Sequence, residues 1–193
     1  FAGVLWTGNN IDKDVLFTGD YEETYTDGTT SRNFRPDLVW TKQRSGGNHH
    51  KLADSVRTAA NSLTSSVANP ENYSNNGKVG SFLTNGFYVE DQNSNNDDIN
   101  FNGYTYIGYC WKAGGAPSGS LGTIDATTPS GAGTIAQSSD SGYSLIQNAT
   151  NLTQSVNRDS GFSITKFTGS ASGCTIPHNL GGTPEWFMIK NLD

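Results

Sequence analysis

Short apolar runs of strand length dominate the pattern of hydrophobic and polar positions along this chain. Residues 38–42 follow Pro36 and combine Leu, Val, Trp, Thr and Lys, which predicts a strand that enters a core. Residues 104–111 are aromatic and β-branched, which is typical of a central strand in a sheet. Residues 162–167 alternate apolar and polar side chains, as a half-buried strand does. The pattern predicts an all-β chain.

Turn and loop signals separate these runs. Residues 81–83 and 87–89 flank an Asn-Gly pair at residues 85–86, which is the strongest short signal for a β-hairpin. The Asn-rich residues 91–102 are predicted to form a loop. Residues 112–157 are rich in Gly, Ser, Thr and Ala, and we interpret them as a long excursion with a few edge strands.

The best helical signal lies between residues 52 and 65. Five apolar residues of this segment would share one face of a helix: Leu52, Val56, Ala59, Ala60 and Leu63. The same segment also divides into two short strands, 52–56 and 62–65. Strands are favoured, because the serines and threonines of the segment are mediocre helix formers.

One order of residues occurs twice along the chain. Residues 5–8 read Leu-Trp-Thr-Gly, and residues 36–42 later run from a proline through an acid and a largely apolar stretch to a lysine. Residues 166–169 read Lys-Phe-Thr-Gly, and residues 184–190 repeat the second word. We interpret this echo as a repeated β-module.

The echo shapes the expected domain organisation. A chain of 193 residues is long enough for one domain with a sizeable core and the edge of a second. We therefore expect residues 1–165 to form one β-sandwich module. Residues 166–193 would either begin a second repeat or supply strands that close the first.

Composition and charge narrow the range of partners. The 4 Trp, 8 Tyr and 9 Phe argue against disorder, although only 33% of the residues are hydrophobic. The net charge is -6 and no Lys/Arg cluster is present, which argues against a nucleic-acid partner. No apolar stretch has the roughly twenty residues of a membrane-spanning helix, so we expect no membrane insertion. Cys110 and Cys174 lack metal-ligand spacing, and free cysteines are favoured over a bridge between them.

The candidate metal site is a calcium loop. Asp91, Asn93, Asn95 and Asp97 place oxygen ligands at alternate positions, as calcium favours. The glycine of an EF-hand is replaced by Asn96, and a solvated Asn/Asp loop is the competing interpretation. Calcium is the one cofactor that the sequence suggests, and otherwise none is expected.

Histidines and carboxylates give little support to catalysis. His50 and Asp54, next to His49, could form a metal pair, but no third ligand follows, and a polar turn is the simpler interpretation. No glutamate lies in an aromatic strand with a carboxylate partner two residues away, and no Ser-His-Asp set or phosphate loop is present. We expect a protein that is not an enzyme.

The chain resembles a sandwich module of marine phage tail proteins, including those of cyanophages. The resemblance covers most of the chain in order. It rests on six words: residues 34–45, 50–57, 84–87, 104–115, 162–169 and 178–184.

This resemblance implies a concanavalin-A-like jelly-roll sandwich in a long, repetitive virion fibre. It brings no catalytic residues with it, and it implies that His178 is a structural residue of a turn. The chain departs from the usual pattern at Ala53, where an aromatic residue is usual, and at Thr58, where glycine is usual. These departures concern the turn between the two strands rather than the fold.

Three functions of different classes follow as expectations. The first is a structural and host-contact module at the virion surface, in a tail fibre or spike, with copies of itself or other virion proteins as partners. The second is an extracellular lectin-like domain that binds a host surface glycan. The third is a subunit of a filament or capsid decoration. Strand aromatics such as Trp40, Tyr106, Tyr109 and Trp111 are expected in the core, so loop tyrosines such as Tyr21, Tyr25 and Tyr73 would be the exposed candidates for a sugar.

Overall fold

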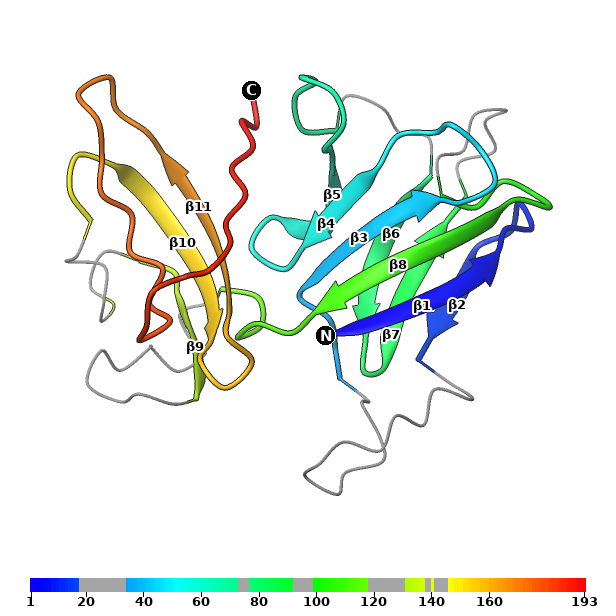
Figure 1. Ribbon diagram of the computed structural model, residues 1–193, viewed down its shortest axis with the longest axis horizontal. Coiled ribbons are helices and arrows are strands. Elements are labelled where there is room, and N and C mark those ends of the chain that lie inside the picture. The colour runs from blue at the N-terminus through cyan, green and yellow to red at the C-terminus, as the bar shows by residue number, and fades with distance from the viewer. Residues whose placement is uncertain (18–33, 73–76, 92–98, 118–130, 138–139, 141–145) are drawn as a thin grey trace. The chain divides into compact units, whose positions relative to one another are not determined.

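The computed structural model describes residues 1–17, 34–72, 77–91, 99–117, 131–137, 140 and 146–193 (Figure 1). These residues form three antiparallel sheets and no helix, which confirms the all-β prediction. None of them lies in a helix that could cross a membrane. The chain divides into two compact units, and each is described by itself.

The first unit comprises Phe1–Ala53, Ala59–Trp111 and Lys190–Asp193 and contains a five-stranded sheet. In sheet order its strands are β1 (Ala2–Thr7), β8 (Thr105–Trp111), β3 (Leu38–Gln43), β4 (Lys51–Asp54) and β5 (Thr58–Thr64). Strand β8 pairs with β1 on one side and with β3 on the other. Both the predicted strand at 38–42 and the internal position of the aromatic strand are therefore confirmed.

A three-stranded sheet belongs to the same unit. Its order is β2 (Lys13–Leu16), β7 (Gly86–Glu90) and β6 (Lys78–Leu83). The pairing of Leu83 with Gly86 closes a hairpin around Thr84 and Asn85, as the Asn-Gly pair predicted.

One hydrophobic cluster holds side chains from both sheets of this unit. Trp6 of β1 stacks on Tyr106 of β8 at 5.3 Å between ring centroids and meets Phe87 of β7 edge-on at 5.6 Å. Its indole Nε1 donates a hydrogen bond to the Ile99 carbonyl at 3.1 Å, so the polar atom of a buried ring is satisfied. Such aromatic pairs contribute roughly 0.5–1.5 kcal/mol each beyond the burial of their area.

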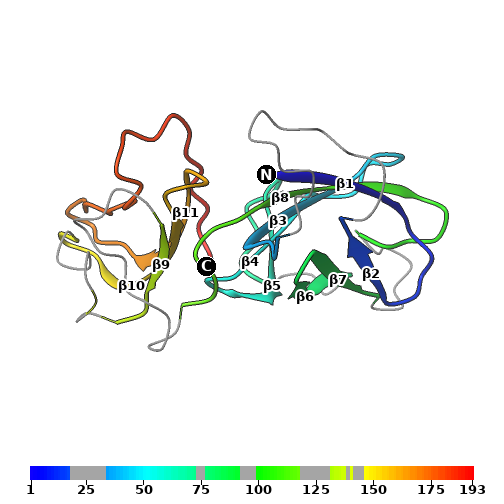
Figure 2. The ribbon, with the colours of Figure 1, turned by 90° about the horizontal axis from the view of Figure 1, so that it is seen from below.

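A glycine in β8 makes room for this packing. Gly108 faces the core between Tyr106 and Cys110, and a Cβ added there would lie 3.1 Å from Phe87 Cζ. The β7 strand therefore lies close beneath β8, and Figure 2 shows β8 and β3 in one layer and β6 and β7 in another. The core of the unit lies between these layers, because its cluster takes residues from both.

The segment from residue 52 to residue 65 forms strands and not a helix. Strands β4 and β5 enclose a turn at residues 55–57, and Leu52, Ala59 and Leu63 are buried. The helical spacing of the apolar residues is a by-product of the three-residue turn between the two strands. The prediction of strands is confirmed, although β5 begins earlier than expected.

The second unit comprises Asp54–Thr58 and Lys112–Ile189. Its sheet has the order β11 (Phe162–Thr168), β10 (Thr150–Asn157) and β9 (Ala132–Ile135), and Ile135, Leu152 and Val156 form a small core. The predicted strand at 162–167 is confirmed. Within the excursion at 112–157, however, β10 is the central strand of a sheet and not an edge strand.

The position of β10 depends on a buried polar residue that the apolar pattern does not reveal. Gln154 lies between Leu152 and Val156 on the inward face and is fully buried. Its Nε2 donates to the Pro177 carbonyl at 2.6 Å and to Thr165 Oγ1 at 2.7 Å, and its Oε1 accepts from Asn179 Nδ2 at 2.7 Å. A glutamine with these bonds can replace an apolar residue in a core.

The short motif of an aromatic residue followed by Thr and Gly occurs twice, and each copy ends a strand in a different unit. Residues 6–8 close β1 and residues 167–169 close β11, and each aromatic ring packs on the core of its own unit. The expected boundary between residues 165 and 166 falls inside β11. The division into a module at 1–165 and a second element at 166–193 stays a prediction.

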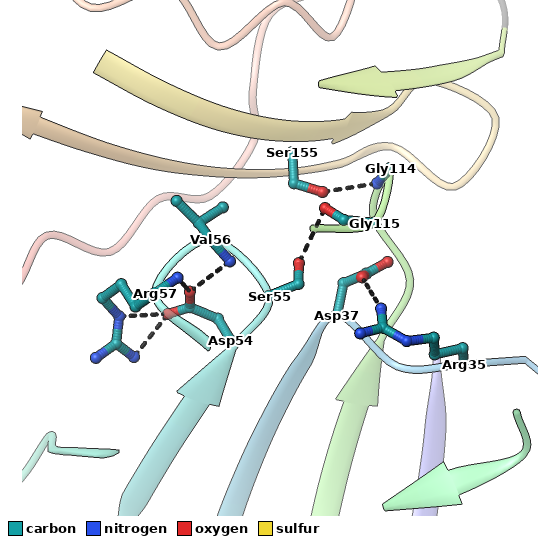
Figure 3. Close-up of polar contacts among 9 residues, drawn as sticks. All are labelled: Arg35, Asp37, Asp54, Ser55, Val56, Arg57, Gly114, Gly115 and Ser155. Atoms are coloured by element: carbon teal, nitrogen blue, oxygen red, sulfur yellow. Dashed lines mark hydrogen bonds and ion pairs between the residues drawn. The ribbon is translucent and has the colours of Figure 1, made fainter. Parts of the chain in front are cut away.

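The turn between β4 and β5 is held by an internal ion pair (Figure 3). Asp54 Oδ1 accepts hydrogen bonds from the backbone nitrogens of Val56 and Arg57, and its Oδ2 binds the Arg57 guanidinium at 2.6 Å. Both charged side chains are buried. Directly after them, Thr58 has a φ of +79°, a left-handed backbone that a β-branched residue rarely adopts. Thr58 is the position at which the resembling modules carry glycine.

Thr58→Gly is expected to stabilise the protein by about 1 kcal/mol, because glycine adopts this backbone without the steric cost that threonine bears. The free energy of unfolding would be measured by urea denaturation. Ala60→Gly in the interior of β5, where φ is not positive, is the matched control and should lower stability by about 0.5–1 kcal/mol. If both glycines lowered the stability alike, the strain at Thr58 would be excluded.

Candidate functional site

The side chains of β8 alternate between the two faces of the five-stranded sheet. Tyr106 and Cys110 are fully buried in the core. Tyr109 and Trp111, at the intervening positions, point to the opposite face, where Tyr109 is 37% exposed and Trp111 is half-buried. One strand therefore builds both the core and an outer aromatic surface.

Two further rings join them from the neighbouring strands. Trp40 of β3 is paired in register with Tyr109, and their ring centroids are 6.5 Å apart. Phe1, directly before β1, lies 5.0 Å from the Trp111 ring and 6.2 Å from the Tyr109 ring. We call the surface formed by Phe1, Trp40, Tyr109 and Trp111 the aromatic face.

The expectation that all the strand aromatics lie in the core was therefore wrong in part. Tyr106 is a core residue, but Tyr109 is exposed and Trp40 and Trp111 are half-buried. The physical reason is the strand's period of two, which sends neighbouring aromatic residues to opposite faces. A continuous aromatic run hides this alternation.

A neutral imidazole extends the aromatic face. Trp40 Nε1 donates a hydrogen bond to His50 Nδ1 at 2.9 Å, and the two ring centroids lie 5.7 Å apart. Because Nδ1 accepts, the neutral ring carries its proton on Nε2. Desolvation, with smaller effects from the positive charge of Lys42 and from His49, lowers the pKa of His50 below its ordinary value. His50 is therefore neutral at pH 7.

The ammonium group of the nearby Lys42 is held in place by backbone carbonyls. Its Nζ donates to the carbonyls of Gln43, Gly46 and Asn48 at 2.7, 3.1 and 3.0 Å. An ammonium group has three protons, so these contacts use its full donor capacity. Lys42 orders the loop after β3 and has no donor left for a ligand.

The predicted calcium loop lies mostly outside the described residues. Asn93, Asn95 and Asp97 are not described, and the backbone nitrogen of Asp91 donates to Asp12 Oδ1 at 2.7 Å. In the part of the chain that the structure describes, no group of three or more His, Cys, Asp or Glu side chains could hold a metal ion. The calcium loop stays a prediction.

The structure gives the other candidate side chains local partners. Asp54 binds Arg57, His50 accepts from Trp40, and a ring nitrogen of His49 lies 2.9 Å from Ser66 Oγ. The simpler interpretation of a polar turn is therefore favoured over the metal pair. His178 Nδ1 accepts from the Leu180 backbone nitrogen at 3.1 Å, as a structural residue of a turn does.

Both cysteines are free, as the sequence favoured. Cys110 is buried in the first core, and this burial raises the pKa of its thiol far above the ordinary value. A thiol that stays protonated is a poor nucleophile, so Cys110 serves as a packing residue. Cys174 is exposed.

The apolar segment in residues 184–190, the second copy of the motif that begins with a proline and an acid (the Pro-acid word), is also exposed. Trp186, Phe187, Met188 and Ile189 are 62%, 74%, 41% and 75% exposed, and they belong to no strand. At the matching positions of the first copy, Leu38, Val39 and Thr41 are buried in β3. The same word is thus a buried strand in one place and an uncovered segment in the other.

Comparison with known proteins identifies one family. A model of a family described as a domain of unknown function (DUF7483) matches residues 8–154 and again residues 147–193. No curated protein matches this chain. No solved structure matches it either.

Acidification is expected to break the bond between Trp40 and His50, because a protonated imidazole cannot accept at Nδ1. Since the pKa of His50 is lowered in the folded protein, its NMR titration midpoint should lie below the ordinary 6.5. The unfolded chain takes up this proton first, so stability should fall as the pH drops through about 6.5 and level off below the folded-state pKa. A His50 midpoint at or above 6.5 would contradict the assignment.

Proposed function

Because this chain belongs to the DUF7483 family, for which no activity is described, we propose its function from the site and from its resemblance to phage tail modules. The chain is a structural and host-contact module of a phage virion surface protein, in a tail fibre or spike, and it is not an enzyme. The observation that carries the contact role is the aromatic face, which presents large rings outward from an ordered sheet.

The finer fold that we propose for the first unit is a concanavalin-A-like jelly-roll sandwich. The five-stranded and three-stranded sheets support it, because one hydrophobic cluster takes residues from both. Long-range antiparallel pairings also support it, since β1 pairs with β8 across about half of the chain. Jelly rolls and related sandwiches join distant strands in this way.

We further propose that residues 166–193 begin a second repeat of the module. The two copies of each sequence motif support this proposal, and the second match of the family model, over residues 147–193, supports a second repeat in this part of the chain. The exposed residues 186–189 also support it, because in the repeated motif they correspond to residues 38–41, which lie in β3. In a fibre of tandem modules, this segment would be covered by the strands of its own repeat.

The proposed partners are copies of the chain, other virion proteins and a host surface glycan, and the proposed location is the virion surface. A lectin-like domain is the second candidate function, and the aromatic face favours it over a filament or capsid subunit. Both candidates use the same face, so they differ in assembly rather than in chemistry.

The purified chain is expected to form a trimer or larger assembly whose mass is unchanged by EDTA. Exposed apolar segments can add to the sheet edges of neighbouring chains, and residues 186–189 are such a segment. Light scattering with and without EDTA would measure the mass. Phe187→Ser should weaken the assembly, whereas Ile11→Ser, an isolated residue of the first unit that is 64% exposed, should not. A stable monomer at all concentrations, destabilised by EDTA, would contradict the fibre proposal and favour a calcium-dependent lectin.

A further inference from the structure

We propose that the aromatic face is the host-contact site and that its ligand is an uncharged glycan, bound by stacking of sugar rings. This inference rests on the proposed function, which places host contact on the aromatic face, and it adds the chemical class of the ligand and the way in which it binds. Three observations carry it: the order of the rings, the lack of an available positive charge on Lys42 and His50, and the polar groups at the margin of the face.

The rings are held in fixed positions before any ligand arrives. They belong to β3, to β8 and to the residue directly before β1. Neighbouring ring centroids lie 5.0 to 6.5 Å apart. Strand β8 beneath them is paired on both sides, and its other face is locked in the core. Rigid aromatic side chains on a sheet lose little conformational entropy when a ligand binds.

The chemistry of the surface suits a sugar. A pyranose ring has a C–H face that packs on an aromatic ring and hydroxyl groups at its edge that need hydrogen bonds. The aromatic face offers indole and phenyl faces for the first, while the Tyr109 hydroxyl and the Nε2–H of neutral His50 are polar groups at the same surface.

Electrostatics select an uncharged ligand. Lys42, the cation whose charge acts on His50, already donates to three carbonyls, so it has no proton left for a phosphate or sulfate. His50 itself is neutral at pH 7, and the net charge of the whole chain is -6. An anionic glycan or a nucleic acid would be repelled at long range by the net charge, and neither Lys42 nor His50 offers it a free positive charge.

The inference would be tested with the full chain and a panel of uncharged hexasaccharides with α- and β-linked glucose, mannose and galactose, by calorimetric titration. At least one probe should bind, and Tyr109→Ala should weaken it about tenfold. Tyr104→Ala is the matched control. Tyr104 is also a tyrosine of the first unit, 38% exposed, but its ring packs on Phe101 at the other end of β8. The Tyr104→Ala variant should bind the probe as tightly as the unsubstituted chain does.

Three outcomes would overturn the proposal. They are no binding to any uncharged probe, equal losses in the two tyrosine variants, or preferential binding of sulfated probes that weakens steeply with salt. Binding of the labelled chain to a panel of bacterial cells separates failure of the site from failure of the host-contact function. If cells bind the chain and Tyr109→Ala alike, the host-contact function stands and the site is wrong. If no cells bind and the chain is a monomer, the proposed function itself fails.

Discussion

Strand β8 is the element on which the rest of the first unit depends. It pairs with β1 on one side and β3 on the other, so its backbone is fully used within the sheet. Its inward residues Tyr106 and Cys110 fill the core, and Gly108 between them admits Phe87 from the opposing sheet. Its outward residues then have no role in packing this core. They are available for contact, and the strand that stabilises the unit also fixes the geometry of its surface.

Two networks of buried polar groups also stabilise the structure. The Asp54–Arg57 pair closes the turn between β4 and β5 and satisfies two backbone nitrogens, at the cost of a left-handed Thr58. In the second unit, Gln154 connects β10 to β11 and to the segment at 177–179. Removing one partner from either network would leave a desolvated polar group, which is costlier than a lost surface contact.

Much of the fold could be predicted, because strand signals are local. The apolar run at 38–42, the Asn-Gly hairpin and the alternation at 162–167 each specify a strand through spacing that a short window reveals. The site could not be predicted in the same way. A run such as Tyr104–Trp111 carries aromatic residues at both odd and even positions, so neither face is marked as inward. The central position of β10 was missed for a related reason, since its buried Gln154 looks polar in sequence.

The sequence by itself determined the all-β class, most strand positions and the internal echo, because backbone propensity and turn chemistry act between near neighbours. Tertiary structure decided which aromatic residues are core and which are surface, and which copy of the Pro-acid word is covered. Both outcomes depend on what packs against a strand from elsewhere in the chain. Trp6, Phe87 and Ile99 cover the inner face of β8, and residues so distant in sequence leave no mark on the pattern of the strand itself.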